Sequence, residues 1–528
     1  MQTKDVIFQL RIKFGLSQDK LAEKLFVTRQ AVSRWETGET LPSLDMLKAL
    51  SKLFDQPVDV LLGLPDKKIY QSLKEEDRKM ANLKNWLWIH YEHEIMVDWE
   101  QAHTEGKMVD DLRPICEYIE KNAKKQDLSD LGKEICKKLA DAPMDPAFPY
   151  EEPSEWDEIL AQRPAQTFKK QIVSDDDVLR EKLTGAWIGR IAGCLLGKPV
   201  EGFRTPKLYD VLKSTKNWPM HRYIDSSEFS SELIERWELD PKSCWINNVH
   251  GPSPVDDDTN YTTLGLRLVE VYGKNFTPED VMEAWLRWLP LAAVCTAERV
   301  AYRNAAQGLL PPQTATYQNA FREYIGAQIR ADFFGYVNPG DPEAAAKMGF
   351  KDASISHVKN GIYGEMWVAA MIAVAAVCED MEKIICAGLE QIPANCRLQA
   401  DVSAVLDGWR AGWTEEQSRA AIQAKFNENT AFGWCYTNSN AAIVAHALLY
   451  GKKDFGKTIC LAVQCGFDTD CNGATVGSIL GMVIGGQAIP DSWWKPFGKR
   501  LCTSIDGYPV VSVEDMVEKS LELIHREN

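Results

Sequence analysis

Glycine recurs at every fourth position over residues 185–197. Residues four apart lie on one face of an α-helix, so these glycines would form a smooth stripe on which another helix can pack closely. Membrane helices use the same device, but Arg190 lies within this segment, which favours the interior of a globular domain. The chain is therefore expected to contain a tightly packed helix pair. The four positions are Gly185, Gly189, Gly193 and Gly197.

The composition is that of an ordinary soluble protein of several domains. The 528 residues are 45% hydrophobic and 26% charged, and at roughly 150 residues per domain they suggest three to four compact units. The 13 cysteines include no C-x-x-C pair, which argues against a zinc ribbon or a disulfide framework. Residues 1–15 lack a signal-peptide core, and the apolar run 366–378 is too short to span a bilayer. We therefore expect a cytoplasmic protein without a membrane partner.

The chain divides into three stretches of different texture. Residues 1–66 contain short amphipathic helical segments with tight turns, and residues 67–142 form a Lys- and Glu-rich helical connector. Five prolines between 143 and 164 precede a Gly- and Ala-rich helical pattern, so we assign residues 143–528 to a large domain with its core at 174–528. Strand-like alternation is scarce, and the predicted fold class is all-α.

The first stretch predicts a helix-turn-helix. Ser17 can cap one helix and Thr28 a second over 29–36, in which Val32 and Trp35 face inward. The run resembles the Cro and lambda-repressor-like (XRE) family over roughly residues 4–63, through Ser17-Gln18-x-x-Leu21-Ala22, Val32-Ser33-x-Trp35-Glu36-x-Gly38 and Pro42-Ser43. That resemblance implies an interface with double-stranded DNA. The outward polar residues expected to contact DNA are Gln18, Arg29, Gln30, Ser33 and Arg34.

Charge supports DNA contact by this end of the chain. Residues 1–68 hold 11 basic and 9 acidic residues, whereas the whole chain carries a net charge of −16. Two alternatives stay open: the helical pattern arises by chance, or the module only dimerises. Repressors of this type usually bind as dimers. The connector aromatics Trp86, Trp88 and Trp99 could supply the contact of a homodimer, or could pack onto the large domain.

Two acidic segments, about 210 residues apart, each lead into a predicted helix. The first is Asp256-Asp257-Asp258-Thr259, and by itself it is equally typical of a solvated helix start. The second is Asp468-Thr469-Asp470-Cys471-Asn472-Gly473, which imitates an EF-hand loop but has Ile479 where that loop needs a bidentate Glu. If the segments converge, their five carboxylates could not all stay ionised without cations. One or two hard divalent ions are therefore expected.

These segments resemble the ADP-ribosylglycohydrolase family over about residues 145–528. That family has an S/T-D-D-T motif and a later G-G-D-T-D-T-x-G-A motif, and its all-α fold holds two magnesium ions between them. The resemblance implies two Mg²⁺ here, with Mn²⁺ as the alternative. The ligands it implies are Asp256, Asp257, Asp258, Asp468, Asp470 and Cys471.

Two further segments match the family. Gly197-Lys198-Pro199-Val200-Glu201 corresponds to the end of its G-D-A-L-G-x-P-x-E segment, whose Glu lies near the scissile bond in some members. Glu201, Asp257 and Asp468 are accordingly the expected catalytic residues. A weaker echo of G-N-G-x-x-M-R begins at Asn360, so Asn360, Gly361 and Gly364 are expected to contact substrate.

Three positions depart from the family pattern. Asp256 replaces a Ser or Thr ligand, Cys471 replaces a Thr, and Cys194 replaces the Asp of the Gly-Asp-Ala-Leu-Gly segment. Asp256 adds a charge that would hold a cation more strongly. A thiol at position 471 suits Mg²⁺ poorly and favours Mn²⁺ or one ligand fewer.

The functional hypothesis is hydrolysis of the glycosidic bond of an ADP-ribosyl or related ribosyl group. Metal ions between the two motifs would hold the ribose hydroxyls and a water molecule, and Glu201 or another Asp would move the proton. The alternative is a transcriptional regulator whose C-terminal domain binds ADP-ribose or a nucleoside as an effector with little catalysis. Its motivation is the fused helix-turn-helix together with the substituted ligand positions.

Overall fold

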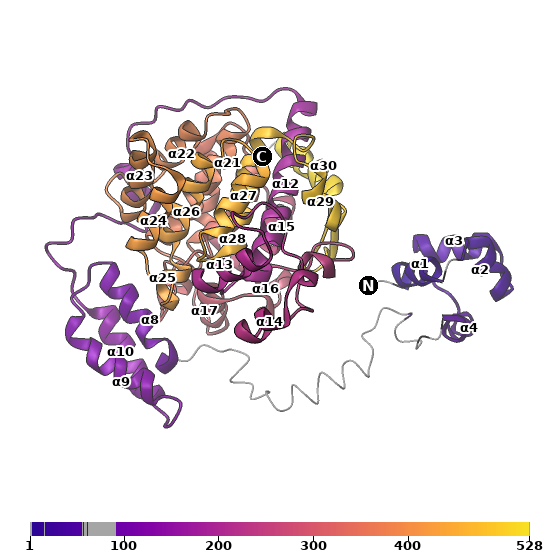
Figure 1. The fold of residues 1–528 in the computed structure, drawn as a ribbon, viewed down its shortest axis with the longest axis horizontal. Helices are drawn as coiled ribbons and strands as arrows, with labels where there is room; N and C mark the ends of the chain where they lie inside the picture. Colours follow the sequence, from indigo (N-terminus) through magenta and orange to yellow (C-terminus); the bar gives the residue numbers. More distant parts are fainter. Residues whose placement is uncertain (1–2, 15, 55, 57–60, 62–90, 527–528) are drawn as a thin grey trace. The chain divides into compact units, whose positions relative to one another are not determined.

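The computed structural model describes residues 3–14, 16–54, 56, 61 and 91–526, and it divides the chain into two compact units, 1–88 and 89–528. Both units are helical, as Figure 1 shows, so the all-α prediction is confirmed. In the described ranges, the regular strands are β1 (Arg500–Cys502) and β2 (Val510–Ser512), which pair antiparallel with Leu501 opposite Val511. No described helix is long and apolar enough to cross a membrane.

The first unit has the expected helix-turn-helix. The Ser17 hydroxyl accepts a hydrogen bond from the Lys20 amide at the start of α2, and the Thr28 hydroxyl accepts one from the Ala31 amide at the start of α3. Val32 and Trp35 lie in the core, as predicted. The helices are α1 (Thr3–Lys13), α2 (Gln18–Leu25), α3 (Arg29–Thr37) and α4 (Leu44–Phe54).

The described part of the expected connector is a three-helix cluster that belongs to the second unit. It comprises α8 (Tyr91–Thr104), α9 (Arg113–Asn122) and α10 (Ser129–Asp141). Trp99 is buried in this cluster, and its indole N–H donates to the Val109 carbonyl at 2.9 Å. Trp99 is therefore not free to form an apolar dimer contact, whereas Trp86 and Trp88 lie outside the described residues.

Buried polar contacts join α8 to the large helical domain. Arg322 donates to the carboxylates of Asp98, at 2.8 Å, and of Glu105, and the Gln101 amide donates to Glu323 at 2.6 Å. The side chain of Arg322 is 13% exposed, and the other four residues of these contacts are buried. Ion pairs of this kind fix relative orientation because separating them would leave buried charges uncompensated.

The glycine stripe lies on α12 (Asp176–Gly197), and its partner is α28 (Thr469–Ile484). Gly185, Gly189 and Gly193 face the backbone of Gly481, Gly477 and Gly473 in turn, so both helices carry glycine at the crossing. A Cβ atom added at Gly189 would lie 2.0 Å from the Gly477 carbonyl oxygen. The predicted close helix pair is thus present, and no larger side chain fits between the two backbones.

The same pairing brings the C-terminal end of α12 to the N-terminal end of α28. The Thr469 hydroxyl donates to the Gly197 carbonyl at 2.9 Å, and a Cβ atom at Gly197 would lie 2.3 Å from the Thr469 carbonyl carbon. Glu201 follows α12 directly after the 3₁₀ turn η2 (Lys198–Val200). The glycine stripe therefore determines where Glu201 and the second acidic segment meet.

We predict that Gly189→Ala lowers the free energy of unfolding of the second unit. Alanine gains up to about 1 kcal/mol in helix propensity over glycine, but its methyl group would overlap a backbone carbonyl that cannot rotate away. Overpacking of this kind typically costs about 1–3 kcal/mol and sometimes more, so the net change is destabilising. Denaturant unfolding followed by circular dichroism measures it. Gly251→Ala is the control, because its added Cβ would meet nothing within 4 Å; equal stability of both variants would contradict the prediction.

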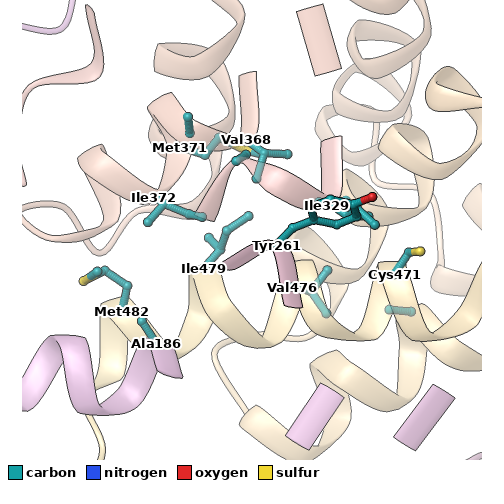
Figure 2. Close-up of a cluster of buried hydrophobic side chains, with 14 of the residues drawn as sticks. Ala186, Tyr261, Ile329, Val368, Met371, Ile372, Cys471, Val476, Ile479 and Met482 are labelled. Carbon is teal, nitrogen blue, oxygen red and sulfur yellow. The ribbon is translucent and has the colours of Figure 1, made fainter. Parts of the chain in front are cut away.

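The remaining helices surround this pair. Figure 2 shows side chains of α12, α15, α21 and α28 in one apolar core, with Ala186, Tyr261, Val368 and Ile479 among them. The α-helices before α21 are α11 (Trp156–Gln162), α13 (Thr205–Ser214), α14 (Ser231–Trp237), α15 (Asp257–Tyr272), α16 (Pro278–Trp288), α17 (Thr296–Ala306), α18 (Gln313–Thr316), α19 (Asp332–Tyr336) and α20 (Pro342–Ala353). Those from α21 onward are α21 (Asn360–Ala375), α22 (Met381–Leu389), α23 (Arg397–Arg410), α24 (Glu415–Lys425), α25 (Ala431–Cys435), α26 (Thr437–Tyr450), α27 (Phe455–Gln464), α29 (Asp491–Trp494) and α30 (Val513–His525). The other 3₁₀ turns are η1 (Asp110–Leu112), η3 (Ser226–Glu228), η4 (Ile246–Asn248), η5 (Leu291–Ala293), η6 (Gln328–Arg330) and η7 (Lys495–Phe497).

Candidate active site

The two acidic segments meet in space. Asp256 is the N-cap of α15 and Asp468 the N-cap of α28, so both segments lie at helix starts, where the helix dipole favours negative charge. The structure contains three groups of side chains, and within each group the possible ligand atoms lie within 4.8 Å of one another. We call these three groups together the acidic cluster. The groups are Cys194, Asp256 and Asp258; Asp258, Asp470 and Cys471; and Glu201, Asp468 and Asp470.

Both oxygens of Asp256 already have partners. Oδ1 accepts a hydrogen bond from the Asp258 amide at 2.9 Å, and Oδ2 accepts one from the Lys198 ammonium at 2.7 Å. Burial opposes ionisation of Asp256, but the charge and hydrogen bond of Lys198 outweigh it, so the pKa of Asp256 is lowered. Lys198 had no predicted role, although it lies in the Gly197–Glu201 segment that resembles the family. Its signal was a single basic residue beside the predicted catalytic Glu.

Arg190 lies beneath the cluster and is fully buried. Its guanidinium donates to Asp258 Oδ1 at 2.8 Å and to the Ile329 carbonyl at 2.7 Å, and it forms an ion pair with Asp332 at 3.1 Å. The charge of one acidic ligand is thereby partly balanced from below. The sequence feature that could have predicted this role is a single arginine within a glycine-rich helix of the core.

Two buried carboxylate oxygens in the cluster have no hydrogen-bond partner. These are Asp258 Oδ2 and Asp470 Oδ1, and their residues are 0% and 2% exposed. Burial, and then neighbouring carboxylates, raise the pKa values of both side chains well above the ordinary range. Buried polar atoms are seldom left unpaired. An oxygen-rich group with unpaired acceptors fits a divalent cation, so the charge and the free oxygens of these residues fit a divalent metal ion.

Glu201 and Asp257 lie at the edge of the cluster. Glu201 is an exposed residue whose carboxylate faces Asp468 and Asp470; partial burial of that carboxylate, with the charges of Asp468 and Asp256, raises its pKa to about 7. Asp257 is half-buried, and burial and the charges of Asp256, Asp258 and Glu201 raise its pKa well above the ordinary range. A carboxyl group with a raised pKa is suited to moving a proton, and Asp256, whose pKa is lowered, supplies a negative charge beside both groups.

Asn440 and Cys435 also position the second acidic segment, and the sequence analysis assigned them no such role. Asn440 Oδ1 accepts hydrogen bonds from the Asp468 amide at 3.2 Å and from the Asn472 side chain at 2.7 Å. The Cys435 sulfur lies 3.7 Å from Asp468 Oδ2. Gly466 and Phe467 have φ values of 79° and 58°, which turn the chain sharply into α28. The orientation of Asp468 therefore depends on α25 and α26.

The structure does not bring the expected substrate contacts of α21 into the cluster. The Asn360 side chain donates to Glu152 and Glu323 at 2.8 and 2.9 Å and accepts from the Leu398 amide. Cβ atoms added at Gly361 and Gly364 would lie 2.8 Å from the Arg322 carbonyl oxygen and 2.5 Å from a Thr437 methyl. These contacts account for all three residues by packing. A substrate contact at Asn360, Gly361 or Gly364 stays a prediction.

A polar cavity of about 370 Å³ adjoins the second acidic segment. Phe467, directly before Asp468, lines it together with Thr205, Lys425 and Glu428. Glu428 accepts hydrogen bonds from the backbone amide and hydroxyl of Thr205, four residues after Glu201. The cavity is large enough for part of a nucleotide.

In the first unit, the expected DNA-contacting residues differ in exposure. Arg29, Gln30 and Arg34 are exposed on α3, and Ser33 is half-buried. Gln18 donates to Glu36 at 2.7 Å, and Glu36 is also paired with the buried Arg11. Gln30 is thus exposed, Arg29 and Arg34 are exposed in ion pairs with Asp19 and Glu39, and Gln18 is held against the unit itself.

Comparison with protein families agrees with this description. The ADP-ribosylglycohydrolase family model matches residues 175–524, and a helix-turn-helix model matches residues 7–61. An all-α domain with an acidic cluster between two helix starts is thereby joined to a DNA-binding module. The chain belongs to the ADP-ribosylglycohydrolase family and carries an N-terminal helix-turn-helix DNA-binding domain.

Individual relatives match short stretches of the chain. The chain is 42% identical to the HTH-type transcriptional activator BcrR of Enterococcus faecalis over 63 residues, 12% of this chain and 31% of that protein. It is 30% identical to the uncharacterized HTH-type transcriptional regulator YobD of Bacillus subtilis over 117 residues, 22% of this chain and 92% of that protein. The chain thus spans about a third of the length of BcrR. A solved structure titled "ADP-ribosylglycohydrolase-related protein complex" aligns with 66% of this chain and 98% of its own, at 19% identity and a TM-score of 0.44.

Proposed function

We propose that the second unit hydrolyses the glycosidic bond of an ADP-ribosyl or related ribosyl group, with one or two divalent cations, Mg²⁺ or Mn²⁺, in the acidic cluster. The observation that carries this proposal is the meeting of Asp258, Asp470 and Glu201 from three segments of the chain. Burying several carboxylates together lowers the stability of the fold. Such groups are therefore found mainly where they bind a ligand or take part in a reaction.

Each side chain of the proposed site has a role that follows from its position. A bound divalent cation would supply positive charge that orients ribose hydroxyls and a water molecule. Asp258 and Asp470 hold it, Arg190 balances Asp258 from below, and Asn440 orients Asp468. Glu201, at the open edge, moves the proton between water and leaving group. The polar cavity beside Phe467 would accept the nucleotide part of the substrate.

A regulator that binds ADP-ribose or a nucleoside without much catalysis is the second candidate. One contact favours it: Val97 of α8 packs against an apolar group that includes Phe432 and Cys435 of α25, and Cys435 lies beside Asp468. The first described helix after the helix-turn-helix unit thus packs against α25, and Cys435 of α25 lies beside Asp468 of the acidic cluster. Ligand at the cluster could change α8, and by reciprocity DNA would change ligand affinity by the same factor.

Product analysis distinguishes the two candidates. The full chain is incubated with a panel of ADP-ribosylated proteins, ADP-ribosylated nucleic acids and ribosyl small molecules, with Mg²⁺ or Mn²⁺, and products are identified by mass spectrometry. We expect release of an ADP-ribosyl or ribosyl group from one class and its loss in chelator. Tight ADP-ribose binding without turnover on any substrate would favour the regulator, and full activity in chelator would contradict the metal-dependent hydrolase.

For the first unit, we predict that Arg34→Ala weakens binding to DNA near the protein's own operon. Arg34 is exposed on α3, and each good base or phosphate contact is worth about 1–3 kcal/mol. Fluorescence anisotropy at two salt concentrations measures the affinity, with ADP-ribose expected to shift it several-fold. Lys20→Ala, on the exposed face of α2, is the comparison. If the affinity for DNA changes neither with Arg34→Ala nor with salt nor with ADP-ribose, α3 is not the DNA interface.

A further inference from the structure

Two sulfur atoms belong to the acidic cluster, which distinguishes it from an all-oxygen magnesium site. Cys194 lies with Asp256 and Asp258, and Cys471 lies with Asp258 and Asp470. Both cysteines are buried, at 2% and 6% exposure. Mg²⁺ is a hard cation that takes oxygen ligands, whereas thiolates favour Zn²⁺ and similar ions. The presence of sulfur among the possible ligand atoms therefore favours an ion that binds thiolate over Mg²⁺.

The unpaired oxygens indicate where in the cluster an ion lies. Asp256 uses Oδ1 for the Asp258 amide and Oδ2 for Lys198, so neither oxygen is without a partner. Asp258 Oδ2 and Asp470 Oδ1 have none. Both of these residues belong to the group that includes the Cys471 sulfur. The position defined by Asp258, Asp470 and Cys471 thus holds the two carboxylate oxygens of the cluster that have no partner, although Arg190 pairs with the other oxygen of Asp258.

Lys198 supplies positive charge on the other side of Asp258. Its ammonium forms a 2.7 Å ion pair with Asp256, whose carboxylate side chain is 2% exposed. Lys198 therefore stands where a second cation would otherwise balance Asp256.

We propose that the acidic cluster binds one thiophilic divalent ion, of the Zn²⁺ and Co²⁺ class, through Asp258, Asp470 and the sulfur of Cys471, while Lys198 takes the place of a second ion. The inference rests on the proposed metal site but replaces Mg²⁺ or Mn²⁺ there by a thiophilic ion, because a thiol among the ligands suits those two cations poorly. On binding, the Cys471 thiol releases its proton to solvent and the thiolate forms the bond to the ion. No electron is transferred.

The contrasting arrangement keeps both thiols protonated. Cys471 and Cys194 would then donate weak S–H hydrogen bonds to the carboxylates, and an ion would be held by oxygen alone. That arrangement predicts a preference for Mg²⁺ or Mn²⁺ and no metal–sulfur signal.

Cobalt titration of the metal-free full chain tests the proposal, because Co²⁺ bound to thiolate gives a near-ultraviolet charge-transfer absorption. We expect this band to saturate at one Co²⁺ per chain and to resist a large excess of Mg²⁺. Cys471→Ser should remove the band and weaken Co²⁺ binding at least about tenfold, since even groups that only orient metal ligands are worth ~10–100-fold in affinity. Lys198→Met should raise the stoichiometry to two.

Other buried cysteines serve as controls. Cys460→Ser, on α27 outside the acidic cluster, should leave the band unchanged, whereas a band lost only in Cys194→Ser would overturn the assignment to Cys471. Asp470→Asn gives a second test if Cys471→Ser does not fold, and it should remove both the band and the saturation. Co²⁺ binding without the band, or displacement by equimolar Mg²⁺, overturns the proposal.

The readout is independent of hydrolysis. A thiolate band in a chain that hydrolyses nothing would support this metal site and remove the proposed hydrolase. Hydrolysis with Mg²⁺ in a chain that shows no thiolate band would support the proposed hydrolase and contradict the thiolate metal site.

Discussion

Asp468→Asn is expected to remove most of the glycosidic hydrolysis while leaving a folded helical protein. Asp468 is the N-cap of α28, 5% exposed, and its donor atom lies within 4.8 Å of those of Glu201 and Asp470. Asparagine keeps the size but loses the charge, so cation affinity and the electrostatic field at the reacting carbon both fall. Asp257→Asn, on the other acidic segment, is expected to give a similar loss.

The measurement compares turnover and metal content of the variant with those of the unchanged chain. Chelation of the unchanged chain should reproduce the loss, and circular dichroism checks the fold. Asp506→Asn is the matched control, because its side chain is 77% exposed and lies outside the acidic cluster. Retention of most turnover in Asp468→Asn, at normal metal content, would remove this residue from the reaction.

The meeting of the two acidic segments could be predicted because it follows from local chemistry. Carboxylates at two helix starts need a common cation, and the glycine stripe requires a close partner helix. The close helix pair is confirmed by the approach of α12 to α28, and Asp258 of the first acidic segment lies beside Asp470 of the second. The caps Ser17 and Thr28 were likewise visible, since a hydroxyl at a helix start has one usual partner.

Lys198 and Arg190 could not be placed in this way. Long basic side chains have many conformers, and their partners depend on which carboxylates the fold brings near. The Lys198 pair with Asp256 joins residues 58 apart, and the Arg190 pair with Asp258 joins residues 68 apart. Neither spacing belongs to a local motif.

Asn360 shows the opposite case, a residue whose sequence context suggests a ligand contact although its partners are structural. Its hydrogen bonds reach Glu152, Glu323 and Leu398, which tie three distant segments together. An amide that donates twice and accepts once is well suited to such a junction. Sequence pattern alone does not distinguish this use from binding substrate.

The last expected result concerns Glu201→Gln, which should lower turnover by about 100- to 10,000-fold, the usual contribution of a proton-transfer group. Glutamine has the same shape but cannot exchange a proton. Because Glu201 is an exposed residue at the edge of the acidic cluster, the substitution should change neither folding nor, to a large degree, the affinity for ADP-ribose. Loss in kcat at nearly unchanged KM would locate the defect in the chemical step.

Two further measurements separate proton transfer from metal binding. Glu201 shares a group with Asp468 and Asp470, so a role as a metal ligand would appear as lower metal content in Glu201→Gln. We expect metal content to stay constant. Glu201→Asp should recover part of the turnover because it restores an ionisable carboxyl, and Glu235→Gln, an exposed residue of α14, should have no effect. Unchanged turnover in Glu201→Gln would contradict a role for Glu201 in proton transfer. That role would then be assigned to Asp257, whose pKa is also raised by burial and by the neighbouring carboxylates.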